Sequence, residues 1–298
     1  MARTDASQAN GWIPEPTTGE VLTRIYETSA VERVARRVQM NSPSVRVPRF
    51  EHEGASIVPE GGLIPVQDAT LDTVLVEASK FADRFTVSIE DDRDAVVSLV
   101  NSFKASWADS YARKLDNACL GVTAASTGPG TDVPFTSVYA AVAAGAGVTA
   151  LGAAGAPRNL QYEDLVTAFD NLEQGDNFGN LVVVAHPAFA GQLRNLKDAS
   201  GVRVVDQPLG AGLPTIFGYS LVFSKGARTS ATATQSPTGN PLLIVGNRSQ
   251  MILGVLDGPE SAAADFRWEY DEREVKMRAR RGFAVADPDA FQVLEKVA

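Results

Sequence analysis

Histidine and cysteine are the side chains that most often mark a catalytic or metal site, and this sequence contains only two histidines and one cysteine. His52 lies between Glu51 and Glu53, so three potential metal ligands stand in a row. Because adjacent residues of a strand point to opposite faces, these three are not expected to converge on one ion. His186 precedes a proline at a predicted helix start, where a capping or core role is commoner than catalysis. Cys119 has apolar helical neighbours and is predicted to be buried and unreactive.

The short motifs that could bind phosphate, calcium or an acyl group are incomplete. Gly145-Ala-Gly147 lacks the lysine and the strand–turn–helix context of a phosphate loop. Gly218-Tyr-Ser220 lacks the closing glycine of a nucleophile elbow. Asp91, Asp92 and Asp94 have no glycine and glutamate at calcium-loop spacing, and are better explained by the positive end of a helix dipole. We therefore expect no catalytic residue, no cofactor and no metal.

Composition restricts the function classes further. Of 298 residues, 44% are hydrophobic and 21% are charged, so the chain is expected to fold as one elaborated domain or two lobes. The net charge of −9 argues against a dedicated nucleic-acid-binding surface, since binding phosphates requires clustered Lys and Arg. The polar start lacks a signal segment, and the glycine-rich stretch 138–157 is a poor membrane span. We expect a soluble protein that is made in the cytoplasm.

The strongest helix signal covers residues 90–120. Apolar side chains recur along it at spacings of three and four, and the three aspartates would occupy its first turns. Gly121 is expected to end it. A helix of about 28 residues would be ~42 Å long, which suits a structural strut. A second helix is predicted over residues 160–173 with Asn159 as its cap, and another begins at Pro187.

Two extended limbs, residues 45–51 and 71–89, flank a glycine- and proline-rich tip at residues 53–65. This pattern predicts a long hairpin with about twenty residues in each limb. The limbs carry too few apolar residues to form a buried sheet of their own. We expect the hairpin to lie on another surface or to be mobile.

The C-terminal third alternates clearly between apolar and polar side chains over residues 266–286. One face carries Val275, Met277 and Phe283, and the opposite face carries a basic row. This row would ordinarily be solvated, but at a subunit interface it could pair with the aspartates at 91, 92 and 94 of a neighbour. Its members are Lys276, Arg278 and Arg280. Further strands are predicted at 181–185, 219–224, 242–245, 251–255 and 291–297.

The order of these elements resembles the major capsid proteins of tailed phages along nearly the whole chain. The resemblance begins with Gly11-Trp-Ile-Pro-Glu15 and continues in the hairpin tip, Ala55-Ser-Ile-Val-Pro-Glu-Gly-Gly62. Phe85-Thr-Val-Ser-Ile-Glu90 then resembles the approach to the long helix. Each motif alone is weak, but together they occur in the family's order. The other matching stretches are 27–31, 111–118, 181–187, 193–201, 216–219 and 281–291.

The resemblance implies an α+β protein of the Hong Kong 97-type fold, which is a shell subunit and not an enzyme. Its implied parts are an N-terminal arm at 1–43, an E-loop hairpin at 44–88, a P-domain at 89–179 and 256–285, and an A-domain at 180–255 and 286–298. The P-domain would contain the spine helix at about 90–120. Interface residues are expected at the arm, the hairpin tip, the acidic cluster and the basic row. They are Trp12, Glu53, Glu60, Gly61, Gly62, Asp91, Asp92, Asp94, Lys276, Arg278 and Arg280.

The family's role would be to assemble as pentamers and hexamers into an icosahedral head that encloses double-stranded DNA. Portal, scaffolding or cement proteins would be partners, and DNA would be enclosed without sequence-specific binding. The tip at 53–65 lacks the lysine that cross-linking members use, so no isopeptide mesh is expected. No scaffold extension precedes the arm, so a separate scaffold or none is expected. Two alternatives stay open: an encapsulin-like nanocompartment shell, and a soluble enzyme with an unrecognised site.

Overall fold

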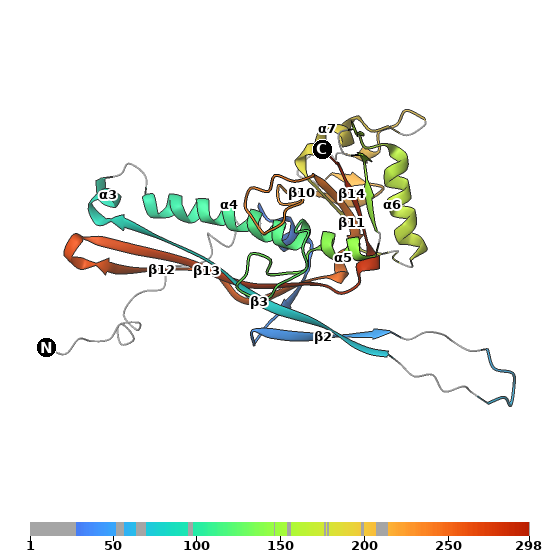
Figure 1. Cartoon of the computed structure of the whole chain (residues 1–298), viewed down its shortest axis with the longest axis horizontal. Helices are drawn as coiled ribbons and strands as arrows, with labels where there is room; N and C mark the ends of the chain where they lie inside the picture. Colours follow the sequence, from blue (N-terminus) through green and yellow to red (C-terminus); the bar gives the residue numbers. More distant parts are fainter. Residues whose placement is uncertain are drawn as a thin grey trace.

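A computed structural model describes residues 28–51, 57–63, 70–94, 98–145, 147–153, 156–175, 177, 179–197, 200–206 and 214–297. The molecule is elongated, with a long helix lying beside a long antiparallel sheet (Figure 1). A second sheet with its own helices stands at one end, and a hairpin projects from the body. Residues 1–27 of the N-terminal arm, with Trp12, lie outside the described residues.

The long sheet has five strands within the described residues, in the order β1-β12-β13-β3-β2. Strand β1 runs parallel to β12, and the other neighbours are antiparallel. The predicted alternation near the C-terminus is confirmed, since Val275, Met277 and Phe283 are buried while Lys276 is exposed. The strands are β1 (Arg36–Gln39), β2 (Ser44–Glu51), β3 (Thr70–Ser88), β12 (Met251–Arg267) and β13 (Glu272–Val285).

The long helix α4 (Leu99–Leu120) begins later than the sequence suggested. Ser98 has non-helical backbone angles and its hydroxyl accepts a hydrogen bond from the Asn101 amide, so it caps the helix. The predicted single helix from residue 90 is therefore wrong, because residues 89–94 form a separate short helix, α3 (Ile89–Asp94). The predicted stop at Gly121 is confirmed.

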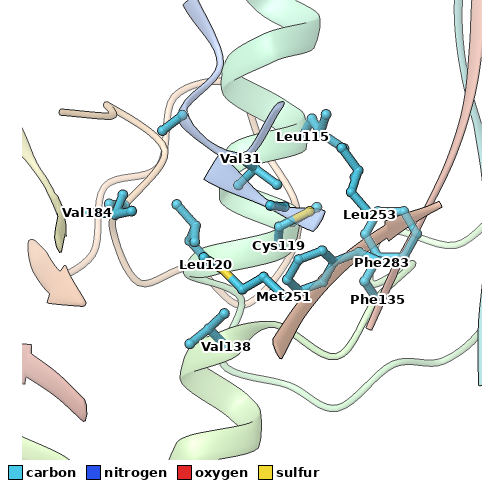
Figure 2. Close-up of a cluster of buried hydrophobic side chains, with 14 of the residues drawn as sticks. Val31, Leu115, Cys119, Leu120, Phe135, Val138, Val184, Met251, Leu253 and Phe283 are labelled. Carbon is cyan, nitrogen blue, oxygen red and sulfur yellow. The ribbon is translucent and has the colours of Figure 1, made fainter. Parts of the chain in front are cut away.

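The first hydrophobic core lies between the C-terminal half of α4, strands β12 and β13, and one face of the second sheet. Leu115, Cys119 and Leu120 of α4 are fully buried in it, which confirms the predicted burial of the cysteine. Figure 2 shows these side chains gathered with Met251 and Phe283 from the long sheet. Burying this face stabilises α4 far more than helix propensity alone.

The second sheet has seven strands in the described part of the chain, in the order β4-β14-β11-β7-β10-β9-β8. Its central strand β7 is apolar throughout because both of its faces are covered. Val182 and Val184 face the first core, while Val183 and Ala185 face the second core, beneath α6 and α7. The strands are β4 (Val148–Ala150), β7 (Leu181–Ala185), β8 (Val205–Asp206), β9 (Thr215–Ile216), β10 (Tyr219–Phe223), β11 (Leu242–Asn247) and β14 (Phe291–Glu295).

The helices around this sheet confirm the predicted elements but correct one cap. Helix α6 begins after Gln161, whose backbone amide donates to Asp164 in a capping box, so the predicted cap Asn159 is wrong. Arg158 holds the same carboxylate through two hydrogen bonds. The remaining elements are α2 (Ala30–Val34), α5 (Val138–Ala144), α6 (Tyr162–Gln174), α7 (Ala190–Asn195) and the two-stranded sheet β5 (Gly152–Ala153) and β6 (Ala156–Pro157). Single 3₁₀ turns lie at Pro187–Phe189, Arg248–Gln250, Trp268–Tyr270 and Pro288–Ala290.

The hairpin of β2 and β3 differs from the prediction at its base. The two strands pair only over residues 44–51 and 70–77, and from Ala78 onward β3 pairs with β13 instead. The predicted length of the second limb is confirmed, since β3 has 19 residues, but only residues 70–77 of it pair with β2 and the rest is a strand of the body. The base also has a small core of its own, formed by Met40, Val76 and Ile252, each 1% exposed.

Candidate functional site

The histidine and the cysteine that the structure describes, His186 and Cys119, both have structural surroundings. No group of three His, Cys, Asp or Glu side chains among them could hold a metal ion, and no described helix is long and apolar enough to span a membrane. His52 and Glu53 lie outside the described residues. Burial raises the pKa of Cys119 well above its usual value, which keeps the thiol protonated.

His186 caps a 3₁₀ turn, as the sequence suggested. Its Nδ1 atom accepts a hydrogen bond of 3.1 Å from the Ala188 amide, which requires a neutral ring. Burial, followed by the charges of Arg228 and Lys225, lowers the pKa of His186 to about 4. The ring is therefore neutral at physiological pH and serves as a structural acceptor.

The hairpin tip exposes apolar side chains. Ile57 and Leu63 have relative exposures of 102% and 93%, so neither side chain packs against the subunit. Between them, Glu60 is exposed and Gly61 has a φ of 78°, a conformation that favours glycine. The Gly62 amide closes the turn by donating to the Pro59 carbonyl at 2.9 Å. Isolated exposed apolar residues are common, but two at the end of a projecting hairpin indicate a contact surface.

The basic row lies on the face of β13 that points away from α4. Two of its members are paired within the chain: Arg278 bonds Glu260, and Arg280 lies 3.6 Å from Asp257. Lys276 is exposed on the same face. The sequence did not suggest these partners, because they lie on β12 and become neighbours only through strand pairing.

The acidic cluster is not at the start of the long helix. Asp91 is exposed and Asp92 is half-buried on α3, while the side chain of Asp94 lies outside what the structure describes. Figure 1 places α3 at the end of the molecule opposite the second sheet. Since α3 has only six residues, the aspartates complement its own short dipole and not that of α4.

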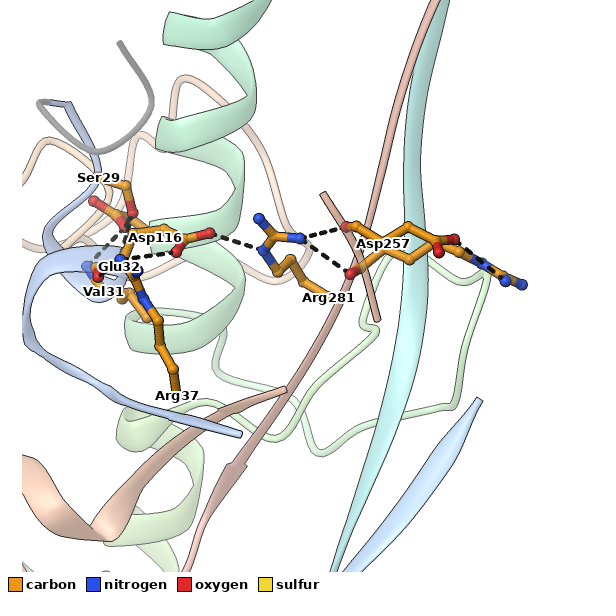
Figure 3. Close-up of polar contacts among 8 residues, drawn as sticks. Ser29, Val31, Glu32, Arg37, Asp116, Asp257 and Arg281 are labelled. Carbon is orange, nitrogen blue, oxygen red and sulfur yellow. Dashed lines mark hydrogen bonds and ion pairs between the residues drawn. The ribbon is translucent and has the colours of Figure 1, made fainter. Parts of the chain in front are cut away.

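The body of the molecule contains a buried ion pair that was not predicted from the sequence. Arg281 and Glu32 are 1% and 2% exposed, and the Arg281 Nε atom donates to a Glu32 carboxylate oxygen at 2.8 Å (Figure 3). Arg281 also donates to the backbone carbonyl of Asp257 at 2.6 Å, beside an irregularity in the β12–β13 pairing. The signal was available, since Arg281 shares the strand parity of Met277 and Phe283 and therefore points to the apolar face.

Asp116 is a second buried carboxylate that the sequence analysis did not single out. It is 1% exposed and accepts four hydrogen bonds, from the Ser29 and Ser224 hydroxyls and from the Ala30 and Val31 amides. Its position on the buried stripe of α4 was the available signal. Asp116 thus joins residues 29–31 to Ser224, which are far apart in the sequence.

Comparisons with known proteins agree with this architecture. The model of the phage capsid family matches residues 10–296. The chain belongs to the phage capsid family. It is therefore a structural protein of a virus shell and not an enzyme, and the exposed hairpin tip and buried polar groups are parts of a capsid subunit. A comparison with curated proteins gave no match.

Solved structures confirm the α+β capsid fold. A chain from Mycobacterium phage Bobi is 19% identical, with a TM-score of 0.68 and 99% of each chain covered. A chain from Gordonia phage Cozz is 16% identical, with a TM-score of 0.66, and the match covers 91% of this chain and 87% of the other. The capsid of an empty GTA particle is 18% identical, with a TM-score of 0.62 and 100% of each chain covered.

Proposed function

We propose that this capsid protein assembles as pentamers and hexamers into the icosahedral head of a tailed phage, enclosing its double-stranded DNA. The observation that carries the proposal is the family match over residues 10–296. The projecting hairpin supports it, because a strand pair with exposed apolar ends gains burial only against another molecule. Portal, scaffolding or cement proteins are the further partners we propose, with synthesis in the host cytoplasm.

The four parts implied by the resemblance are proposed with the same boundaries. The arm spans residues 1–43, the E-loop 44–88, the P-domain 89–179 with 256–285, and the A-domain 180–255 with 286–298. The presence of two separate sheets supports this division, since β13 belongs to the long sheet beside α4 while β7, β10 and β11 build the second sheet, and the first core lies between them.

The proposed contacts between copies use the hairpin and the charged surfaces. Residues 50–73 contain five acidic residues and no Lys or Arg. This segment, with Glu53 and Glu60, gives one copy a negative projection that fits a positive surface of the next. The basic row is the surface we propose, through the exposed Lys276 and through Arg278 and Arg280, which would exchange their partners within the chain for acidic residues of the neighbour. The aspartates of α3 are a second candidate partner for it. Trp12 is proposed as a contact of the arm.

The test is electron microscopy of the purified protein after concentration at low salt. Closed shells, or rings with fivefold and sixfold symmetry, are expected. A particle of about one chain mass, 31.6 kDa, under every condition would contradict the proposal. Heads isolated from infected cells should contain DNA protected from nuclease; shells filled with protein cargo would overturn the DNA-enclosing role.

The same heads test the absence of covalent cross-links. Boiling in detergent should release single chains of 31.6 kDa, because the tip lacks a lysine and Lys80 lies in the part of β3 that pairs with β13. Ladders of covalent oligomers that persist in detergent would show that this prediction is wrong.

A further inference from the structure

A single buried carboxylate connects two distant parts of the chain. Asp116 receives three of its hydrogen bonds from the start of the N-terminal segment, defined here as residues 28–40: from the Ser29 hydroxyl at 2.6 Å and from the Ala30 and Val31 amides at 2.9 and 3.2 Å. Its fourth bond, also 2.6 Å, comes from the hydroxyl of Ser224 just after β10. Figure 3 shows the N-terminal side of this arrangement against α4.

No ion pair joins Asp116 to a cation in the described part of the chain, so its charge is held by hydrogen bonds alone. Burial raises the pKa of Asp116, and the hydrogen bonds from Ser224 and Ser29 oppose that rise. A buried charge that only hydrogen bonds stabilise depends on each of its four donors, because losing one leaves the other three to offset the whole desolvation cost. The strength of the hydrogen bonds from residues 29–31 therefore depends on the bond from Ser224, and the reverse.

The neighbouring residue binds the same distant segment. Asn117 donates from its side-chain amide to the carbonyls of Gly226 and Arg228, at 3.1 and 2.9 Å, and accepts from the Thr234 amide. A Cβ atom at Gly226 would lie 2.6 Å from the Cβ of Asp116, so this segment touches the helix directly. We call residues 224–234 the junction loop.

Each of the two serine hydroxyls bridges a backbone amide and the Asp116 carboxylate. Ser29 accepts from the Glu32 amide and donates to Asp116, while Ser224 accepts from the Gly226 amide and donates to Asp116. The local turn on each side is thus completed only when its hydroxyl is oriented by the carboxylate. Displacing one side changes the acceptor on which the other side depends.

We propose that Asp116 is a latch that couples the docking of the N-terminal segment to the position of the junction loop. The segment contains α2 and β1, and the loop follows β10 of the second sheet. Release of the segment therefore loosens the loop, and movement of the loop loosens the segment. The coupling belongs to the single subunit, so it holds whether or not shells form.

The test is hydrogen exchange of the full-length unassembled protein, with two substitutions that act on opposite sides of the carboxylate. Ser29→Ala should speed exchange about tenfold in the junction loop, to which Ser29 makes no hydrogen bond, in addition to its local effect. Ser224→Ala should do the same in the N-terminal segment. Ser261→Ala, a buried serine of β12 without contact to Asp116, is the matched control and should change neither segment.

A double-mutant cycle gives a second readout. If the latch exists, the loss of unfolding free energy in the combined variant should differ from the sum of the losses in the two single variants, because both substitutions act through one charge. Exchange changes confined to the mutated side, together with additive shifts, would overturn the proposal. Cross-effects from each side onto the other support it.

Discussion

Apolar side chains are buried at the base of the hairpin and exposed at its tip. At the base, Val76 is 1% exposed and packs with Met40 and Ile252. At the tip, Ile57 and Leu63 are almost wholly exposed. The base is therefore stabilised by its own chain, while the tip gains burial only from another molecule. This difference separates substitutions that unfold the subunit from those that only prevent its association.

Loss of the buried arginine should have the largest effect on the body. Arg281→Ala leaves the buried Glu32 carboxylate with only the longer contact to the partly exposed Arg37, at 3.5 Å, so the free energy of unfolding should fall by about 3 kcal/mol. Arg280→Ala removes only a partly exposed pair with Asp257 and should cost less than about 1 kcal/mol. Urea unfolding measures both, and equal losses at the two adjacent positions would contradict the buried role of Arg281.

A smaller loss is expected at the base of the hairpin. Val76→Ala removes two methyl groups from a closed cluster and should destabilise the subunit by about 2 kcal/mol. The neighbouring Leu75 is 44% exposed, and Leu75→Ala should change stability by less than about 0.5 kcal/mol. Thermal unfolding compares them; if the Leu75 variant melts lower than the Val76 variant, the base has no core of its own.

The His186 cap should give a modest dependence on pH. Its pKa is about 4 in the folded protein and 6.5 in the unfolded chain, so only the unfolded chain binds a proton between these values. The cap's contribution is complete above pH 6.5 and decreases as the pH falls toward 4, by about 1 kcal/mol after allowing for solvent at the ring.

His186→Asn isolates this contribution, because asparagine caps the turn without titrating. The parent protein should lose stability relative to the His186→Asn variant as the pH falls from 6.5 to 4. Above pH 7 the difference in stability between the two proteins should stay constant. A constant difference over the whole range would show that the histidine does not act as a neutral acceptor.

Strand alternation was predictable from the sequence because one face of β13 is buried and the other is solvated. The long helix was only partly predictable. Its apolar spacing gave the buried half, but its start is set by Ser98, and a serine within a periodic pattern is easily taken as an interior residue. The predicted cap of α6 was wrong for a similar reason, since Gln161 is an uncommon cap and acts here through Asp164.

Partners that come together through tertiary structure were not predictable. Glu32 and Arg281 are 249 positions apart, and Asp116 lies 87 positions from Ser29, so no local pattern links them. Sequence parity could place Arg281 on the buried face but could not name its partner. The hairpin base was misjudged for the same reason, because Met40 follows β1 and Ile252 comes from β12.

The smallest effect on folding and the largest on assembly are expected at the hairpin tip. Replacing Ile57 and Leu63 together by serine removes exposed apolar surface and should leave the unfolding transition within about 0.5 kcal/mol of the parent protein. Assembly should be lost, because the tip can bury these side chains only against a neighbouring copy. The central measurement is electron microscopy of this variant beside the parent protein and the Leu75→Ala control. We expect the tip variant to be a folded subunit that forms no shells, while the control assembles. Normal shells from the tip variant would show that these side chains are not needed between copies.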